Sequence, residues 1–247
     1  MEGASWWNQA FEAAGFINAF QVKILPDSAD PMDLRYNMIN WVHRSTRGWS
    51  FGDAVVDPRT GEIIKGNVSL GSLRVRQDYL IAQGLLAPFD TDSLPKDDAM
   101  LQMALARLKQ LAAHEVGHTL GLMHNYIASA EGMASVMDYP HPMVKLTGDN
   151  KITLADAYDN KIGAWDKVSI RYGYAEFVAG TDEVTALNKI LMDAANSGLS
   201  FISDRDARDA GGLHPNAHLW DNGTDPVTGL KDVMKIRAVA MNNFGLN

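Results

Sequence analysis

The sequence predicts an α+β protein in which a twisted mixed sheet with helices is followed by a second half of mainly helices and loops. Short apolar segments with partial alternation between residues 20 and 70 are typical of strands. Two stretches with helical periodicity follow, over 73–86 and 96–120. After Gly121 the chain is rich in Gly, Asn, Asp and Pro, which favour loops. Three more candidate helices lie in this second half, near 153–172, 182–196 and 229–243.

Composition indicates one globular domain over residues 1–247, which we divide into subdomains 1–121 and 122–247 with a cleft between them. The net charge is −8 and no segment is strongly basic, which argues against a nucleic-acid partner. No apolar run approaches the ~20 residues that span a membrane. Because cysteine is absent, a metal site must use His, Asp or Glu.

The first elements are a helix and two strands. Residues 4–19 are predicted to be helical, and Gly15 can end the helix. FQVKIL (20–25) and LRYNMINWV (34–42) are predicted strands. The helix is predicted from apolar residues that recur at helical spacing, namely Trp7, Ala10, Phe11 and Ala14.

A β-hairpin is predicted over about 51–70. Its strands, FGDAVV and EIIKGNVSL, flank DPRTG, whose Pro and Gly favour a turn. A short helix over 73–86 and a long one over 96–120 follow. The predicted apolar stripe of the long helix consists of Leu101, Leu105, Leu108 and Ala112.

The long helix ends in HEVGHTLGLMHN (114–125), which holds three of the seven histidines. His114 and His118 lie about 40° apart around a helix axis and about 6 Å apart along it, so both imidazoles can reach one ion. His124 would point about 240° round a continuing helix, and it can join them only if the chain turns back. Gly121 stands where this turn is needed and accepts the left-handed conformation of a helix end.

Three neutral histidines and a water form an open tetrahedral zinc site of the catalytic kind. Zinc lowers the pKa of such a water to about 7 and polarises a carbonyl. Glu115 is placed to hold the water and to take its proton, which is the chemistry of peptide hydrolysis. The alternative is an amphipathic helix with ordinary histidines. About one chance occurrence of HExxHxxGxxH in 10⁵ chains of this composition argues against it.

The extended motif resembles that of the metzincins, zinc metallopeptidases with a methionine turn. SVMDYP (135–140) follows the third histidine by about a dozen residues. The resemblance implies a metzincin-like zincin fold with the zinc cleft between the subdomains. It implies that Met137 is the methionine of the turn, below the zinc, and that Tyr139 assists the substrate oxyanion, as in astacins and serralysins. The alternatives are an ordinary core methionine and a tyrosine packed beside a proline.

Within the metzincins the chain is most similar to the EcxA-like zinc-binding metallopeptidases, large multidomain bacterial proteins. This resemblance implies further domains in a longer parent chain and export of the full-length protein to the periplasm, the cell surface or the medium. No signal peptide opens this sequence, and the strand that precedes the first helix of metzincins is missing, so we expect an excised domain or a trimmed first strand. The resemblance covers nearly the whole chain and is carried by WWNQAFEAAGF, NWVHRSTRGWSFGDAVVDPRTGEI, SLGSLRVRQDYL, IGAWDKVSIRYGY and HPNAHLWDNG.

The metzincin resemblance also implies where a substrate lies. An extended peptide adds to the edge strand of the sheet by backbone hydrogen bonds. We assign this edge to Gly52, Asp53 and Ala54, within residues 52–56. Pro140 and His141, after the methionine turn, are expected to line the pocket on the primed side of the scissile bond.

Two other segments have some features of metal sites. His214 and His218 are four residues apart, but HPNAH has the Pro and Asn of a loop, so a second metal site is the less favoured interpretation. DNGTDPVTG (221–229) has the Asp and Gly content of a calcium loop. Its spacing does not match an EF-hand, so a tight turn is favoured over a calcium cofactor.

Together these residues predict a zinc-dependent endopeptidase that acts on a peptide or protein. Two alternatives stay open, because ligands alone do not identify the scissile group. One is a zinc amide hydrolase for a non-protein substrate such as a peptidoglycan peptide. The other is a catalytically inactive binding domain on a metzincin-like fold, against which the presence of Glu115 argues.

Overall fold

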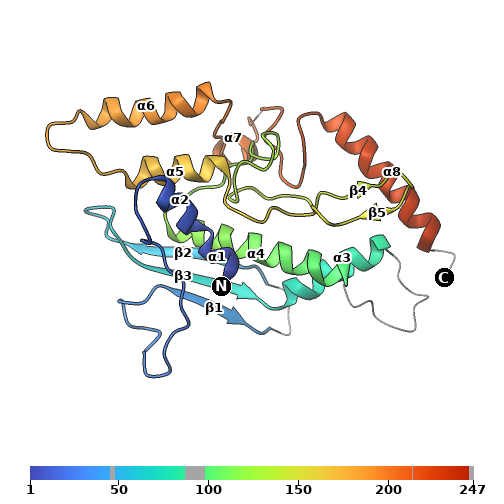
Figure 1. Cartoon of the computed structure of the whole chain (residues 1–247), viewed down its shortest axis with the longest axis horizontal. Coiled ribbons are helices and arrows are strands. Elements are labelled where there is room, and N and C mark those ends of the chain that lie inside the picture. The colour runs from blue at the N-terminus through green and yellow to red at the C-terminus, as the bar shows by residue number, and fades with distance from the viewer. Residues whose placement is uncertain (45–47, 87–97, 213, 245–247) are drawn as a thin grey trace.

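The helices and strands form an α+β fold (Figure 1). The structure is a computed structural model that describes residues 1–44, 48–86, 98–212 and 214–244. Its main sheet consists of β1 (Met38–Val42), β2 (Phe51–Val56) and β3 (Ile63–Gly71), in the order β1-β3-β2. β1 runs parallel to β3 and β2 antiparallel to it, so the sheet is mixed, as the sequence predicts.

The predicted hairpin over 51–70 is confirmed as β2 and β3. In the turn, the Asp57 N–H donates to Glu62 O at 2.9 Å, and the Gly61 N–H donates to Asp57 O at 2.8 Å. Gly61 has a φ of +78°, which glycine adopts without strain. The order of strands leaves β2 at one edge of the sheet. Gly52 of β2 lies close to Glu115, near the C-terminal end of the long helix.

The N-terminal region differs in part from the prediction. The helix over 4–19 is two short helices, α1 (Glu2–Ser5) and α2 (Trp7–Ala13), and the chain turns at Gly15 with a φ of +98°. The strand over 20–25 is wrong: these residues pair with no strand. Phe20 instead stacks on Phe11 of α2, with ring centroids 5.7 Å apart. Some of the apolar residues that suggested a strand therefore pack against the core beside α2. The strand over 34–42 is limited to β1.

The two helices after the hairpin are confirmed as α3 (Leu73–Leu86) and α4 (Ala99–Thr119), while residues 96 and 97 lie outside the described part of the chain. The stripe predicted for α4 is wrong at Leu101 and Leu105, which are exposed. The buried face includes Arg107 and Gln110 instead. α4 runs between the sheet and the C-terminal half (Figure 1), so it buries more than one side. Arg107 donates through Nη1 to the Gln110 side chain, and Gln110 Nε2 donates to Val136 O.

The second half consists mainly of helices and loops, as predicted. The helix expected over 153–172 begins only at Ala164, because β5 and turns occupy residues 152–163. No helix in the described part of the chain has the length and apolar character needed to cross a membrane. The elements are β4 (Lys145–Leu146), β5 (Ile152–Thr153), α5 (Ala164–Tyr174), α6 (Glu183–Asn196), α7 (Asp204–Arg208) and α8 (Pro226–Phe244).

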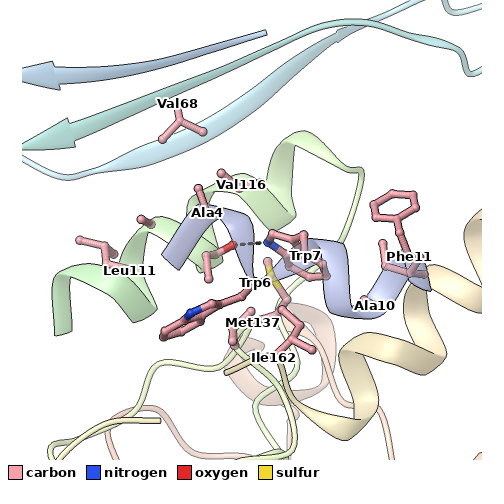
Figure 2. Packing of buried hydrophobic residues seen from close by; sticks show 14 of the residues in the cluster. Ala4, Trp6, Trp7, Ala10, Phe11, Val68, Leu111, Val116, Met137 and Ile162 are labelled. Atoms are coloured by element: carbon pink, nitrogen blue, oxygen red, sulfur yellow. Dashed lines mark hydrogen bonds between the residues drawn. The ribbon is translucent and has the colours of Figure 1, made fainter. Parts of the chain in front are cut away.

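The main core contains residues from both halves of the chain and packs against the C-terminal part of α4 (Figure 2). Trp7 is fully buried, and its indole N–H donates to Ala113 O on α4 at 2.8 Å. Met137 packs beside it from the second half of the chain. This core therefore fixes the C-terminal part of α4 relative to the segment that follows the third histidine.

Candidate metal centre

The last turns of α4 place two histidines side by side. The imidazole centroids of His114 and His118 lie 4.8 Å apart, and their Nε2 atoms 3.2 Å apart. His114 is buried and His118 is partly buried. Both side chains line the inner wall of a cleft. This is the arrangement that a four-residue spacing on one helix produces.

The end of α4 brings the third histidine to the pair. α4 ends at Thr119, and Gly121 takes a φ of +83°. The Leu122 N–H donates back to Gly117 O at 3.1 Å, which closes the helix end. After this turn the ring of His124 lies 5.3 Å from that of His114 and 4.7 Å from that of His118. One ligand atom from each of the three imidazoles lies within 4.8 Å of the other two.

Each imidazole uses Nδ1 to bond the protein. The partners are Val136 O at 2.8 Å for His114, Leu122 O at 2.9 Å for His118, and the Asp204 carboxylate at 2.7 Å for His124. Carbonyl and carboxylate oxygens only accept, so each Nδ1 carries a proton and, in the neutral imidazole, each Nε2 presents a lone pair.

A cation fits between these lone pairs. Two unprotonated Nε2 atoms 3.2 Å apart cannot bond each other, since neither has a proton to donate. The Nε2 of His124 is buried and has no hydrogen-bond partner among the described residues. Three convergent nitrogen donors with Nδ1 held by outer partners are the usual environment of a zinc ligand set. The residues present therefore fit the zinc ion that the sequence predicts.

Burial also sets the protonation of the site. It lowers the pKa of His114 well below its ordinary value, and it lowers the pKa of His118 as well, so both are neutral at pH 7 and able to bind a metal. Glu115 is buried beside them, and burial raises the pKa of its carboxyl to about 7. Hydrogen bonding with the Gly52 backbone and the charge of Arg107 act in the opposite direction.

Asp204 was not found from the sequence. It is the first residue of α7, and one carboxylate oxygen accepts from His124 Nδ1 at 2.7 Å. The other accepts from the Tyr126 hydroxyl at 2.8 Å. His124 and Asp204 are 80 positions apart in the sequence, so no local pattern pairs them. From the sequence alone, an aspartate in the first turn of a helix indicates only a favourable interaction of its charge with the helix N-terminus.

Asn125 explains how so distant a residue reaches the site. Its side chain is fully buried, donates to Ser200 O at 3.0 Å and accepts from the Ile202 N–H at 3.0 Å. The Tyr126 N–H donates to Ile202 O at 2.8 Å. The residue after the third histidine therefore ties residues 200–202 to the site, and α7 with Asp204 follows directly.

The predicted methionine turn packs against α4 beside the three histidines. Met137 is buried, and its Sδ would lie 2.2 Å from a Cβ added at Gly117. The glycine inside HEVGH is therefore required by close packing, which the local sequence pattern does not indicate. Val136 O accepts from both His114 Nδ1 and Gln110 Nε2, the latter at 3.0 Å, so the turn also orients the first ligand.

Asp166 of α5 fixes the conformation of the methionine turn. Its buried carboxylate accepts from Ser135 Oγ at 2.6 Å, the Val136 N–H at 2.9 Å and the Gly163 N–H at 2.8 Å. Burial raises its pKa to about 6, although these three hydrogen bonds lower it. A carboxylate from the C-terminal half thus holds the loop on which the first ligand depends.

The cleft above the histidines has a volume of about 540 Å³. The edge strand β2 forms one wall with Gly52, Asp53 and Ala54, the three residues expected there. A Cβ at Gly52 would lie 1.8 Å from Glu115 O, so only glycine lets the strand come this close to α4. Tyr139 lines the cleft as well, with its ring 5.3 Å from that of His114.

Pro140 and His141, which the resemblance implied would line the substrate pocket, do not line this cleft. The chain leaves the site after Tyr139, because His141 O accepts from the Asn222 side chain at 3.0 Å and draws the segment toward the C-terminal region. His141 lines a separate cavity formed with α8. Pro140 lines a small pocket behind the methionine turn, together with Gln110 and Ser129.

The two less favoured metal segments are placed as follows. His214 and His218 lie in a loop, and among the described residues they belong to no group of three potential ligands. In the 221–229 segment, Asp225 accepts from the backbone N–H groups of Val227 and Thr228, at 3.2 and 3.0 Å. Its carboxylate therefore serves the start of α8, and residues 226–229, predicted as part of a turn, are helical.

Comparison with known proteins agrees with this geometry. A family model described as Met-zincin matches residues 96–247, which is more than half of the chain and contains the three histidines, Glu115 and the methionine turn. Comparisons with curated proteins and with solved structures gave no match. The match and the group of three histidines indicate a zinc-binding metalloprotease. The chain therefore belongs to the Met-zincin family.

Proposed function

We propose that this chain is a zinc endopeptidase and forms a single catalytic domain over residues 1–247. One observation carries the proposal: three Nε2 lone pairs converge at the floor of an open cleft beside the buried carboxyl of Glu115. His114, His118 and His124 would hold the ion. When bound, zinc supplies Lewis-acid polarisation of the scissile carbonyl and acidifies a water molecule.

Glu115 is the proton carrier in this proposal. It takes a proton from the attacking water and delivers it to the leaving amine. A carboxyl whose pKa lies near 7 can both accept and return a proton at neutral pH. Its position in the cleft between the edge strand and the histidines supports this role, because the scissile bond of a peptide bound along the strand would lie next to it.

Tyr139 and β2 would bind the substrate. The Tyr139 ring borders the rings of His114 and His124, at 5.3 and 4.7 Å, so its hydroxyl is proposed to stabilise the oxyanion that forms during attack. β2 is an edge strand, and an extended peptide can add to it by backbone hydrogen bonds. Gly52 to Ala54 then lie along the substrate backbone.

The finer assignments belong to the same proposal. Similarity of five segments, HPNAHLWDNG among them, supports membership of the EcxA-like group, and with it export and further domains in a parent chain. A binding domain without activity is less favoured, because such a domain does not need an acidic proton carrier. A non-protein amide is distinguished from a peptide by the substrate test below.

The testing experiment compares the wild-type chain with Glu115→Gln. Elemental analysis of both proteins, purified without added metal or a nickel column, should give about one zinc per chain. A peptide library should be cleaved by the wild type, and Glu115→Gln should lose activity by at least a hundredfold, the lower range for a general base. Zinc-loaded wild type that cleaves no peptide but does cleave a peptidoglycan peptide would transfer the assignment to that amide. Equal turnover in the variant would remove Glu115 from the mechanism.

A further inference from the structure

The edge strand β2 presents one carboxylate between two apolar side chains. A Cβ at Gly52 would lie 1.8 Å from Glu115 O, so this position faces α4. Successive side chains of a strand point to opposite faces, and those of Phe51, Asp53 and Val55 therefore lie on the face away from α4. Phe51 and Val55 are 48% and 59% exposed, and Asp53 is exposed between them. This face of β2 is thus open to a neighbouring chain.

The Ala54 backbone points to the open edge of the sheet. Gly66 is its partner on β3, but the Gly66 N–H donates to Asn37 Oδ1 at 2.8 Å. The two residues therefore do not exchange the two bonds of a hydrogen-bonded ladder pair. The Ala54 N–H instead donates to the Asp53 carboxylate at 2.8 Å. Asp53 thus occupies a backbone donor that an added strand would use.

The same alternation directs the Gly52 backbone into the zinc cleft. Gly52 comes two residues before Ala54, so its N–H and C=O point to the same edge of the sheet. Its backbone hydrogen-bonds with the Glu115 carboxyl, which lowers the pKa of that group. Asp53 therefore lies between the two β2 residues whose backbone can pair with a substrate, one residue from the contact with Glu115.

The charge of Asp53 is not balanced by a cation of the cleft. Among the described residues that line the cleft, none is Lys or Arg. Lys65 of β3 lies on the same face as Asp53, but its ammonium group donates to three backbone carbonyls instead, those of Pro31, Asp33 and Tyr36. The Asp53 carboxylate is therefore available to a cation that a substrate brings.

We propose that Asp53 makes the cleft selective for a peptide that carries Lys or Arg opposite it on the added strand. Such a strand takes the Ala54 N–H from Asp53, and the displaced carboxylate gains the cationic group as its new partner. Side chains opposite each other on neighbouring strands share one face, with Cβ atoms about 5 Å apart. The methylene stem of the basic residue covers the exposed surface of Phe51 and Val55. The proposal rests on the proposed peptidase function, but its binding step can be measured without turnover.

The binding test uses fluorescence anisotropy of labelled peptides on the zinc-loaded Glu115→Gln chain, in which cleavage is expected to be slow. The peptides are short alanine-based chains in which Lys or Glu is placed at each position in turn. At one position the Kd should favour Lys over Glu by about fivefold, from the combined effect of an opposite-charge and a like-charge cross-strand pair. Adding Asp53→Asn should bring this ratio close to one, because the amide keeps an oxygen acceptor for the Ala54 N–H but has no charge.

Glu62→Gln is the matched control for the loss of one negative charge. Glu62 is exposed on the same hairpin and does not line the cleft. Added to the Glu115→Gln chain, it should keep the preference for Lys at the same position.

The cleavage test measures kcat/KM for the same peptides. Wild type and Glu62→Gln should prefer Lys over Glu by about fivefold at that position, Asp53→Asn should lose the preference, and Asp53→Lys should reverse it. Cleavage without a charge preference at any position, or with a preference that Asp53→Asn retains, overturns the selectivity and leaves the peptidase assignment intact. Preferential binding of Lys peptides that requires Asp53, without cleavage of any peptide by the wild type, supports the selectivity and overturns the peptidase. Peptides that are neither bound nor cleaved overturn both.

Discussion

At the scale of single residues, the least predictable feature of the site is Asp204. It fixes the tautomer of His124 by accepting from Nδ1, and the Tyr126 hydroxyl holds its second oxygen. Outer carboxylates of this kind raise the basicity of a ligand and restrict its rotation. Because His124 leaves the helix for an irregular segment, it has no backbone ladder to orient it and depends on this contact more than the helical ligands do.

We therefore predict that Asp204→Ala weakens zinc binding by about 10–100-fold, the range for loss of such a partner. Competition with a chromophoric chelator measures the zinc Kd directly and does not need a substrate. Asp206→Ala is the matched control, since Asp206 lies on the same short helix and is exposed. An unchanged Kd in Asp204→Ala, with the control also unchanged, would show that Asp204 does not orient the ligand.

At the scale of elements, the close contact between α4 and the methionine turn depends on Gly117. Alanine has the higher helix propensity by about 1 kcal/mol, so propensity alone predicts that Gly117→Ala stabilises the chain. Packing predicts the reverse, because the new Cβ would meet Met137 Sδ at 2.2 Å and the Trp7 ring at 2.7 Å. Both of these side chains are buried and cannot move aside freely.

We expect Gly117→Ala to lower the free energy of unfolding by about 1–3 kcal/mol, the usual cost of overpacking. Urea denaturation of the zinc-free chain measures this. Gly84→Ala on α3 is the control, because a Cβ there meets nothing within 4 Å and should raise stability by up to about 1 kcal/mol. Equal effects at the two positions would mean that the turn does not press on α4.

Asp166 gives the contact between α5 and the methionine turn a pH dependence. Burial raises its pKa from an ordinary 3.8 to about 6, so the folded chain holds this proton more tightly than the unfolded chain. The stabilising contribution is complete below about pH 4 and is lost as the pH rises through 6. The difference between the two pKa values corresponds to about 3 kcal/mol.

Asp166→Asn cannot ionise and should lack this dependence. The wild-type free energy of unfolding minus that of Asp166→Asn is expected to fall by up to about 3 kcal/mol between pH 4 and pH 7. Urea titrations at pH 4, 5, 6 and 7, with a chelator present so that zinc does not contribute, provide the comparison. A difference that stays constant across this range would contradict the raised pKa.

At the scale of the whole molecule, local patterns predicted most of the fold and the three ligands. The hairpin, α3 and the end of α4 at Gly121 depend on turn residues and periodicity, which act within a few residues. Three features depend on distant partners instead: FQVKIL has no strand beside it, Arg107 is buried although charged, and Asp204 approaches His124 from α7. No short-range pattern encodes such contacts.

The zinc ligands also lie across the boundary between the two halves, which gives a prediction for the entire chain. His114 and His118 belong to the first half, while His124 and its partner Asp204 belong to the second. Zinc that binds only the folded chain stabilises it by about 2.7 kcal/mol at a free concentration 100 times the Kd. For a chain of this size that corresponds to a rise in Tm of roughly 5–10 °C.

Differential scanning calorimetry in zinc buffers should show this rise as one cooperative transition, because an ion held from both sides of Gly121 couples the unfolding of the two halves. Calcium at the same concentration should leave the Tm unchanged, because the Asp225 carboxylate serves the start of α8. His118→Ala removes one of the three nitrogen donors and should abolish the response to zinc. A rise of equal size in that variant would mean that zinc acts elsewhere, whereas a rise confined to one of two separate transitions would mean that the ligand set does not couple the halves.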